Sequence, residues 1–268
     1  MAAAMGDASN WPSYGRDYTN QRFSPLAEIT AANVKGLSLA WHYKTGVPKE
    51  FETSPVVVGG TMYLTTALNH VIALDAATGA KKWEWVAQLG TTIFCCGPVN
   101  RGVAVYGGRV YVGTLDARLF ALDAATGREV WQVQVADNTA AHSITMAPLA
   151  VDGKIITGIS GAEYGIRGFV TAYDAATGRQ LWRWYTIPSP EEGGWWGQFV
   201  ATDPFGTPLN RDLAQEHADS AKYADAWRHG GGSVWQTPAV DLARGMLVLT
   251  ASVFAAAIGW KRLRPDVY

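Results

Sequence analysis

Charged residues are scarce in this sequence. They make up 17% of its 268 residues, and the formal net charge is −1. So weak a charge excludes a protein that holds nucleic acid electrostatically, and it provides no basic patch for anionic membranes. No apolar run reaches about 18 residues, so no transmembrane segment is predicted. Residues 1–10 show neither the charged start nor the apolar core of a signal peptide.

Histidine and cysteine are also few. None of the five histidines has the spacing of a zinc site. The two cysteines, Cys95 and Cys96, are adjacent, and consecutive Cα atoms lie about 3.8 Å apart, below the usual disulfide range of about 4.4–6.8 Å. A bridge between them would close a small, strained ring. The residues alone leave open both that bridge and a pair of reduced thiols.

What the sequence does contain is an eleven-residue phrase that occurs three times, at 73–83, 121–131 and 172–182. Each copy holds Asp-Ala-Ala-Thr-Gly and ends in a Trp eight residues after the Asp, and the Asp residues recur at spacings of 48 and 51. A period near fifty with strands on both sides is typical of a propeller blade. A generic β-hairpin is the alternative, but it does not explain three evenly spaced copies.

Each phrase has a physical interpretation. The apolar run before the Asp is a strand, and the following residues form a turn, because Asp accepts backbone N–H hydrogen bonds and Gly supplies a positive φ. The Trp lies on the returning strand, where it fills the wedge between neighbouring sheets. We therefore predict three four-stranded antiparallel units, over 54–86, 103–135 and 147–187, with Gly-Gly or Asp-Gly hairpins.

The segments before these units are interpreted separately. Residues 10–25 are polar, aromatic and turn-rich, and we interpret 1–36 as an N-terminal arm that lies over other structure. Residues 37–43 alternate like a strand, and Trp41 resembles the Trp of the repeat, so a fourth blade strand is predicted there.

The segments after them complete the predicted organisation. A short helix is predicted near 218–227, within a polar stretch, and strands at 235–240 and 246–250 begin a further unit. The partial propeller is therefore expected over 37–250. Residues 251–268 contain neither the Asp-Thr-Gly turn nor the spaced Trp. We expect this tail not to belong to the native fold, as in a truncated or frame-shifted product.

A candidate site follows from propeller geometry. The first strand of each blade lines the central channel, so the residues just before those strands converge at one mouth. These residues are Glu52, Arg101 (beside Asn100), Thr145 and Trp235. Such a set suits a planar, polar, anionic ligand, because Trp offers a stacking face and Arg a bidentate clamp for a carboxylate. The alternative is that they are ordinary loop residues.

A second candidate feature is the Ser-Gly-Ala-Glu loop at 160–163. Hard cations such as calcium take carboxylate and carbonyl oxygens as ligands, and Glu163 offers a carboxylate. One Glu alone is a weak indication of a metal site.

These residues resemble one known family, the PQQ-dependent (quinoprotein) alcohol dehydrogenases, which include methanol dehydrogenase. The resemblance runs from Trp11 to about Thr250. The Trp repeats alone would indicate only the wider propeller superfamily. The motifs that carry it are Trp-Pro-Ser-Tyr-Gly-Arg at 11–16, Gln-Arg-Phe-Ser-Pro at 21–25, Phe-Glu-Thr-Ser-Pro at 51–55, Cys-Cys-Gly-Pro-Val-Asn-Arg-Gly at 95–102, Ser-Gly-Ala-Glu at 160–163 and Gly-Gly-Gly-Ser-Val-Trp at 230–235.

The resemblance implies an all-β fold, an eight-bladed β-propeller of four-stranded antiparallel blades. About three complete blades plus parts, an incomplete ring, are expected here. It implies PQQ (pyrroloquinoline quinone) in the axial cavity, with Cys95 and Cys96 as a vicinal disulfide on one face and Trp235 on the other. Glu163 would ligate calcium or a lanthanide. The residues implied to hydrogen-bond the cofactor are Glu52, Arg101, Thr145, Ser160, Gly161, Ala162 and Ser233.

The implied activity is oxidation of a small alcohol to an aldehyde in the periplasm, with electrons passed to cytochrome c.

Family members carry an Asn metal ligand after the strand that matches 246–250, where this sequence reads Ala-Ser-Val-Phe. The catalytic Asp is expected beyond Tyr268, so we expect the chain to be inactive alone. Two alternatives stay open. The first is a non-catalytic propeller scaffold, although such a scaffold has no use for Cys95, Cys96 and 160–163. The second is a quinone-dependent sugar dehydrogenase, although these enzymes typically lack adjacent cysteines.

Overall fold

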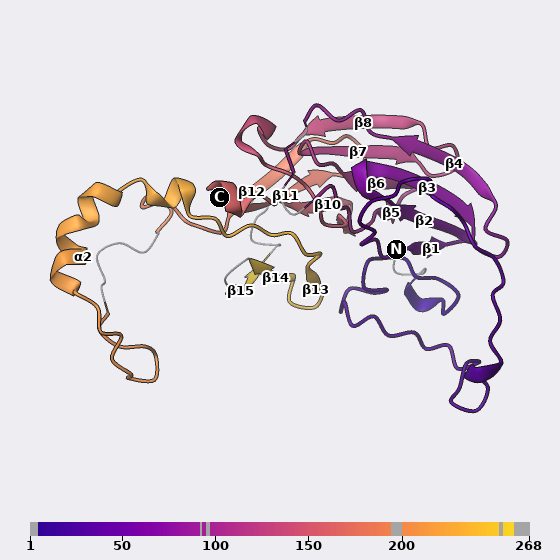
Figure 1. The fold of residues 1–268 in the computed structure, drawn as a ribbon, viewed down its shortest axis with the longest axis horizontal. Coiled ribbons are helices and arrows are strands. Elements are labelled where there is room, and N and C mark those ends of the chain that lie inside the picture. The colour runs from indigo at the N-terminus through magenta and orange to yellow at the C-terminus, as the bar shows by residue number, and fades with distance from the viewer. Residues whose placement is uncertain (1–4, 92, 95–96, 194–199, 252–253, 260–268) are drawn as a thin grey trace.

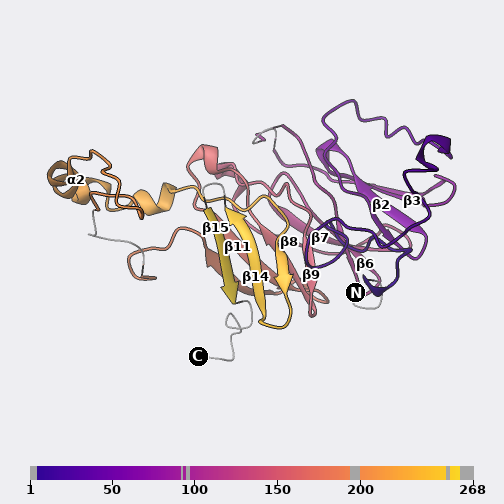
Figure 2. The same ribbon diagram turned by 90° about the horizontal axis from the view of Figure 1, so that it is seen from below.

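Three four-stranded antiparallel sheets follow one another along the chain and fan out beside each other (Figure 1, Figure 2). The computed structural model describes residues 5–91, 93–94, 97–193, 200–251 and 254–259. In every sheet the strands pair in the order in which they occur in the sequence. The first strands β1, β5 and β9 contact one another in turn, so they form the inner edge of the fan.

The strand bounds are as follows. The first sheet contains β1 (Val56–Val58), β2 (Thr61–Thr65), β3 (His70–Asp75) and β4 (Lys81–Val86); the second contains β5 (Ala104–Tyr106), β6 (Arg109–Gly113), β7 (Arg118–Asp123) and β8 (Glu129–Gln134); the third contains β9 (Leu149–Val151), β10 (Lys154–Gly158), β11 (Phe169–Asp174) and β12 (Gln180–Tyr185). A further sheet has three described strands, β13 (Ala239–Asp241), β14 (Met246–Ala251) and β15 (Phe254–Gly259). The prediction of an all-β, partial propeller of four-stranded antiparallel blades is confirmed.

Each blade turn is built by its Asp. Asp123 accepts hydrogen bonds from Ala125 N at 3.2 Å, from Thr126 N at 2.9 Å and from Thr126 Oγ1 at 2.7 Å. The Thr126 hydroxyl and the two backbone donors stabilise the ionised carboxylate and lower the pKa of Asp123. Gly127 then takes φ +72°, which glycine adopts without strain. The same bonds recur at Asp75 and Asp174.

The Trp of each repeat connects neighbouring blades. Trp83 Nε1 donates to the carbonyl oxygen of Ala124, in the turn of the next blade, at 3.0 Å. The indole also lies flat against Gly127, where a Cβ atom would approach it to 2.6 Å. Trp131 makes the equivalent contacts with Ala175 and Gly178 of the third blade. The wedge role predicted for this residue is therefore observed, together with a specific hydrogen bond.

Trp182 differs from the other repeat tryptophans. Its Nε1 is buried and has no hydrogen-bond partner among the described residues. In the first blade, Asp75 at the end of β3 pairs with Thr61 at the start of β2. In the last sheet, Gly259 at the end of β15 pairs in the same way with Met246 at the start of β14. Gly259 therefore stands where the other blades carry the turn Asp.

Apolar side chains fill the spaces between consecutive sheets. Phe120 and Leu122 of β7 pack with Val71 of the first blade. A second cluster joins the second and third blades, and a third cluster joins the third blade to β13 and β14 through residues such as Leu247. The core is therefore a series of layers between blades, which is how stacked sheets bury both of their faces.

The N-terminal arm crosses the inner edge of this fan. Trp11 and Val57 form a two-way backbone bridge, with N···O distances of 2.8 and 2.9 Å. Farther along the arm, the Tyr18 hydroxyl donates to Ala150 O at 2.9 Å, and the backbone carbonyl oxygen of Tyr18 accepts from Val240 N at 2.7 Å. The arm thus joins the first, third and fourth sheets.

The structure departs from the expected local structure at residues 37–43 and near residue 250. Residues 37–43 form no strand, because no described strand lies beside them to pair with; Trp41 nevertheless docks on Gly79 and donates to Ala76 O at 3.3 Å. Strand β14 runs one residue past the boundary drawn at 250, and β15 pairs with it. The division into 1–36, 37–250 and 251–268 stays a prediction.

The predicted helix near 218–227 was misplaced. The α-helix α2 spans Leu213–Asp219, because Asp212 caps its first turn by accepting from Gln215 N at 3.0 Å. Two 3-10 turns follow, Ser220–Tyr223 and Ala226–His229. Figure 1 shows α2 extending away from the sheets. Other 3-10 turns are Val34–Gly36, Ala67–Asn69, Asn138–Ala140 and Ala162–Tyr164. No helix in the described ranges is long and apolar enough to cross a membrane.

Candidate functional site

The segments that precede the first strands are hydrogen-bonded to one another. Ser54 N donates to Arg101 O at 3.0 Å, and Arg101 N donates to Thr145 O at 2.9 Å. Three blades therefore bring their pre-strand residues together by backbone contacts, which fixes the positions of the side chains between them. This is the convergence that propeller geometry predicted.

Arg101 is the centre of the cluster. Its Nη2 lies 2.7 Å from Glu52 Oε2, and its Cζ lies 4.8 Å from the centre of the Trp235 ring. The side chain of Arg101 is 16% exposed and that of Glu52 is 42% exposed. A carboxylate, a guanidinium and an indole from three separate parts of the sequence thus form one contact set.

Two buried hydroxyls lie in the same region. Thr145 Oγ1 and Ser160 Oγ are 2.8 Å apart, and both residues are less than 5% exposed. Ser160 is held by a two-way backbone bridge with Ser143, at 3.1 and 2.7 Å. Either hydroxyl can be the donor of this bond, because each O–H can rotate, so the pair can present either a donor or an acceptor to a bound group.

The Ser-Gly-Ala-Glu loop packs closely against other backbone. Gly161 has φ +118°, and a Cβ atom there would lie 2.5 Å from Ala141 O, so no larger residue fits. Ala162 and Glu163 form the following 3-10 turn, in which Glu163 is exposed. Among the described residues, no group of three His, Cys, Asp or Glu side chains gathers that could hold a metal ion.

The segment that carries Ser233 and Trp235 lies directly beside this loop. Val234 N donates to Ile159 O at 2.9 Å. A Cβ atom on Gly158 would lie 2.2 Å from Val234 O, so the two backbones are in contact. Ser233 is 2% exposed. The structure therefore brings Ser160, Gly161, Ala162, Ser233 and Trp235 to one place.

Cys95 and Cys96 lie outside the described residues. Their described neighbours are anchored on both sides: Leu68 N donates to Pro98 O at 2.9 Å, and Tyr164 Oη donates to Phe94 O at 3.3 Å. Because Tyr164 follows Glu163 directly, this flank of the cysteine pair lies beside the Ser-Gly-Ala-Glu loop.

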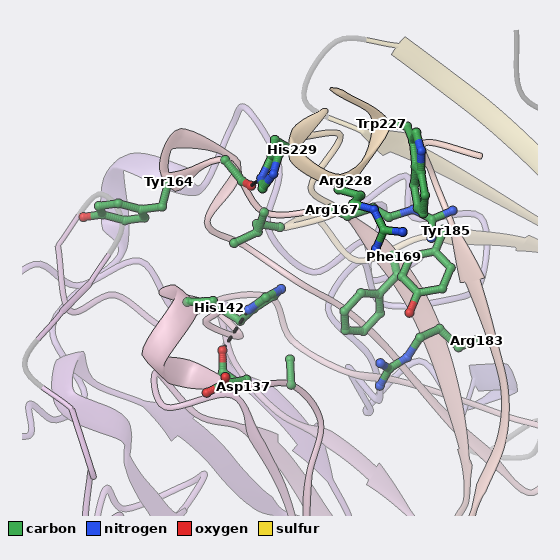
Figure 3. Close-up of a pocket in the computed structure, with 14 residues that line it drawn as sticks. Asp137, His142, Tyr164, Arg167, Phe169, Arg183, Tyr185, Trp227, Arg228 and His229 are labelled. Carbon is green, nitrogen blue, oxygen red and sulfur yellow. Dashed lines mark hydrogen bonds between the residues drawn. The ribbon is translucent and has the colours of Figure 1, made fainter. Parts of the chain in front are cut away.

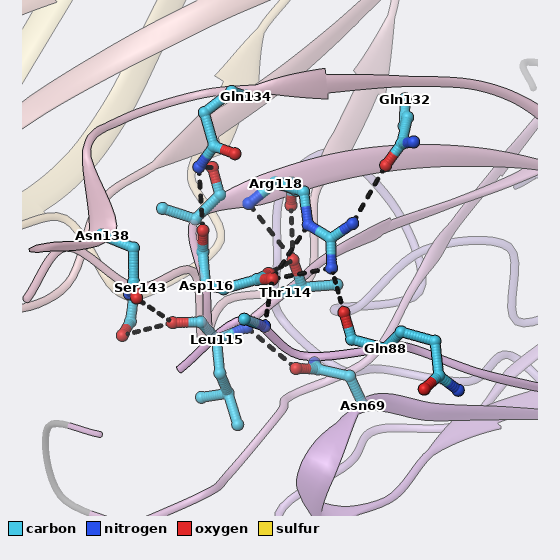
Figure 4. Close-up of polar contacts among 12 residues, drawn as sticks. Asn69, Gln88, Thr114, Leu115, Asp116, Arg118, Gln132, Gln134, Asn138 and Ser143 are labelled. Carbon is cyan, nitrogen blue, oxygen red and sulfur yellow. Dashed lines mark hydrogen bonds and ion pairs between the residues drawn. The ribbon is translucent and has the colours of Figure 1, made fainter. Parts of the chain in front are cut away.

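A polar network that the sequence did not predict holds residues 88–90, which precede the two cysteines (Figure 4). The carboxylate of Asp116 accepts from Thr114 Oγ1 at 2.6 Å, from Arg118 Nε at 2.9 Å and from Gly90 N at 3.0 Å. Burial alone would raise the pKa of Asp116, but these donors outweigh it and lower the pKa. Arg118 also donates to Gln88 O.

This network fixes residues 88–90, a few positions before the cysteines. Its only signal in the sequence is Thr-x-Asp-x-Arg at 114–118. That spacing is common in turns, so it could not have identified the contact with Gly90. Gly90 lies in the connection between β4 and β5 and is brought close by the fold alone.

The donor set fits a planar anion. Arg101 provides a cationic fork, Thr145 and Ser160 provide buried hydroxyls, and Trp235 provides a flat aromatic face. Arg101 already has a carboxylate partner in Glu52, so a bound anion would share or replace that contact.

Comparison with known proteins identifies the family of this chain. The PQQ family described as glucose/ethanol/alcohol dehydrogenase, β-propeller domain, matches residues 11–262. The chain is 43% identical over 241 residues to quinohemoprotein alcohol dehydrogenase ADH IIB of Pseudomonas putida, covering 86% of this chain and 32% of that protein. It is 37% identical over 224 residues to a lanthanide-dependent methanol dehydrogenase of Methylorubrum extorquens, covering 82% and 36%.

Solved structures of the same family have a similar fold. A europium-containing methanol dehydrogenase superposes with a TM-score of 0.79 at 34% identity, covering 93% of this chain and 43% of that one. BamB from Moraxella catarrhalis, at 19% identity and a TM-score of 0.53, shares the fold alone. The chain spans about a third of the length of the curated relatives it matches.

Proposed function

Because the chain belongs to the PQQ-dependent glucose/ethanol/alcohol dehydrogenase β-propeller family, we propose that its residues form part of a PQQ site for the oxidation of a small alcohol to an aldehyde. The alcohol and methanol dehydrogenases among its relatives support the reaction class. The cofactor supplies the redox chemistry; the residues of this chain bind and orient it.

The contact set around Arg101 carries the proposal. PQQ is a flat quinone with several carboxylates, so it needs a stacking face and a cationic clamp. Trp235 offers the face, and the Cζ of Arg101 lies 4.8 Å from its ring centre, so the guanidinium can bind a planar anion by sharing or replacing its contact with Glu52. The hydroxyls of Thr145 and Ser160 and the backbone of Gly161 and Ala162 would hydrogen-bond the edge of the cofactor.

We propose finer roles for four further residues. Glu52 positions the Arg101 guanidinium through their 2.7 Å contact, and Ser233 contributes a polar contact beside Trp235. Cys95 and Cys96 form a vicinal disulfide against the second face of the cofactor. Such a bond requires an oxidising compartment, so we propose a periplasmic location.

Glu163 is proposed as a ligand of the metal that accompanies PQQ. Calcium and lanthanides are hard cations that prefer carboxylate oxygens, and the name of one relative records a lanthanide. We propose cytochrome c as the electron acceptor, since the names of other relatives describe quinohemoproteins. None of the candidate residues is assigned to proton abstraction, and we propose that residues 1–268 alone bind PQQ weakly and oxidise no alcohol.

The test is PQQ titration followed by quenching of Trp fluorescence, with calcium present. Arg101→Gln removes the clamp, and we expect affinity to fall by about tenfold or more, since hydrogen bonds to charged groups contribute roughly 1.5–3 kcal/mol. Arg128→Gln is the matched control, because Arg128 lies in an exposed turn. Equal affinity of the Arg101→Gln variant and the unchanged chain would refute the proposed clamp.

A further inference from the structure

A separate cavity of about 560 Å³ lies between the 136–142 loop, the third blade and the 3-10 turn at 226–229 (Figure 3). None of the candidate PQQ residues lines it. Its volume is within the range of about 300–1,000 Å³ that is typical of small-molecule sites. Its walls combine aromatic rings with several guanidinium groups, which is an arrangement that neither the fold nor the PQQ site requires.

One wall of the cavity is rigidly constructed. The guanidinium of Arg167 lies between two rings, 3.7 Å from the centre of Tyr185 and 4.5 Å from the centre of Trp227. It also pairs with Glu192 and donates from Nε to Ile187 O at 2.8 Å. The charge of Arg167 is thus compensated, and its role is to hold the two aromatic rings in place.

Two other cations at the cavity have no such compensation. Neither Arg183 nor Arg228 forms a salt bridge within the described residues. Arg183 stacks 3.9 Å from the Phe169 ring, and its Nη2 donates to Val135 O at 2.6 Å and to Gln180 Oε1 at 3.3 Å. Its Nε is buried without a described acceptor, and its Nη1 forms no hydrogen bond within the described residues. Arg228 is exposed at the edge of the cavity.

The remaining charges leave the cavity weakly positive. Asp137 is engaged by Thr139, which donates from N at 2.9 Å and from Oγ1 at 2.7 Å. Burial lowers the pKa of His142, whose Nδ1 lies 2.8 Å from Asp137 O, so this ring is neutral near pH 7. Two guanidiniums without an ion-pair partner, against the one carboxylate of Asp137, favour a ligand with a single negative charge.

We propose that this cavity binds a small planar monocarboxylate, with its carboxylate at Arg183 and its flat body against Phe169 and Tyr185. Arg183 has no carboxylate partner within the described residues, and a carboxylate is the group that a guanidinium binds best. Aromatic walls favour a flat apolar body. Arg228, at the rim, attracts the anion without contacting its body.

Benzoate is the probe, measured by isothermal titration calorimetry on the purified chain, with methyl benzoate as its uncharged equivalent. We expect benzoate to bind and methyl benzoate to bind at least tenfold more weakly. Arg183→Gln should weaken benzoate binding by tenfold or more, and Arg228→Gln by a few-fold. Arg179→Gln, the matched control, removes an exposed charge from the same blade and should have no effect.

Two further arms keep the test specific. Arg101→Gln should leave benzoate binding unchanged, because a loss there would assign the benzoate to the PQQ site. Inorganic phosphate should not compete at equal concentration. The proposal is overturned if benzoate does not bind, if phosphate competes equally, or if Arg183→Gln and Arg228→Gln both bind as the unchanged chain does. The Arg228→Gln arm remains informative if Arg183→Gln does not fold.

Discussion

Replacing Gly127 by Ala should test how neighbouring blades are joined. Gly127 has φ +72°, and an added Cβ would lie 2.6 Å from Trp83, whose indole is sealed between two blades. Gly108 has φ +73° but no atom within 4 Å of an added Cβ. The two glycines therefore impose the same backbone strain on alanine and differ only in the contact with Trp83.

The expected magnitudes follow from this difference. Placing alanine in the left-handed region costs about 1–2 kcal/mol, which is the whole effect at Gly108. At Gly127 the indole must also move, and overpacking of this kind adds about 1–3 kcal/mol. We therefore expect Gly127→Ala to lower the free energy of unfolding by about 2–5 kcal/mol and Gly108→Ala by about 1–2 kcal/mol.

The assay is urea unfolding of both variants and of the unchanged chain, followed by Trp fluorescence and by far-ultraviolet circular dichroism. Coincident transitions by the two probes establish a single cooperative step, and midpoints are then compared at equal slope. If Gly127→Ala is no less stable than Gly108→Ala, the indole does not lock adjacent blades in the way described.

Two further predictions concern buried polar groups. Trp83→Phe removes the hydrogen bond to Ala124 O, whereas Trp182→Phe removes a buried donor that has no described partner. In urea unfolding, Trp83→Phe should therefore lower the free energy of unfolding by about 1 kcal/mol more than Trp182→Phe does. Equal losses in the two variants would contradict this prediction. Because the pKa of Asp116 is lowered on folding, its contribution to stability is complete above its unfolded value of 3.8 and is lost as pH falls through the lower folded value. The thermal melting point should therefore drop steeply below about pH 4, and it should drop less steeply in the Asp116→Asn variant. An equal drop in the variant and the unchanged chain would contradict this prediction.

The local turn and strand pattern could be predicted from the sequence because it depends on short-range chemistry. An Asp accepts hydrogen bonds from groups two and three residues ahead, and the following Gly has to adopt positive φ, so both signals lie within five residues. Repetition of this pattern at a fixed period then identified the blades and, through them, the convergence of Glu52, Arg101, Thr145 and Trp235.

Other features could not be predicted because they depend on partners far along the chain. Residues 37–43 have the alternation of a strand, yet a strand forms only where a neighbour supplies hydrogen bonds, and no described strand lies beside them. The contact of Asp116 with Gly90, and the stacking of Arg167 between Tyr185 and Trp227, join segments that no spacing rule connects.

The sequence by itself determined the repeating unit, its turns and the residues that face the inner edge, since each follows from interactions within one blade. Only the tertiary structure decided which tryptophan bonds to which turn and which guanidiniums remain uncompensated. Those outcomes depend on the packing of one blade against the next and on the path of residues 188–231, and packing between distant segments leaves no periodic signal in the chain.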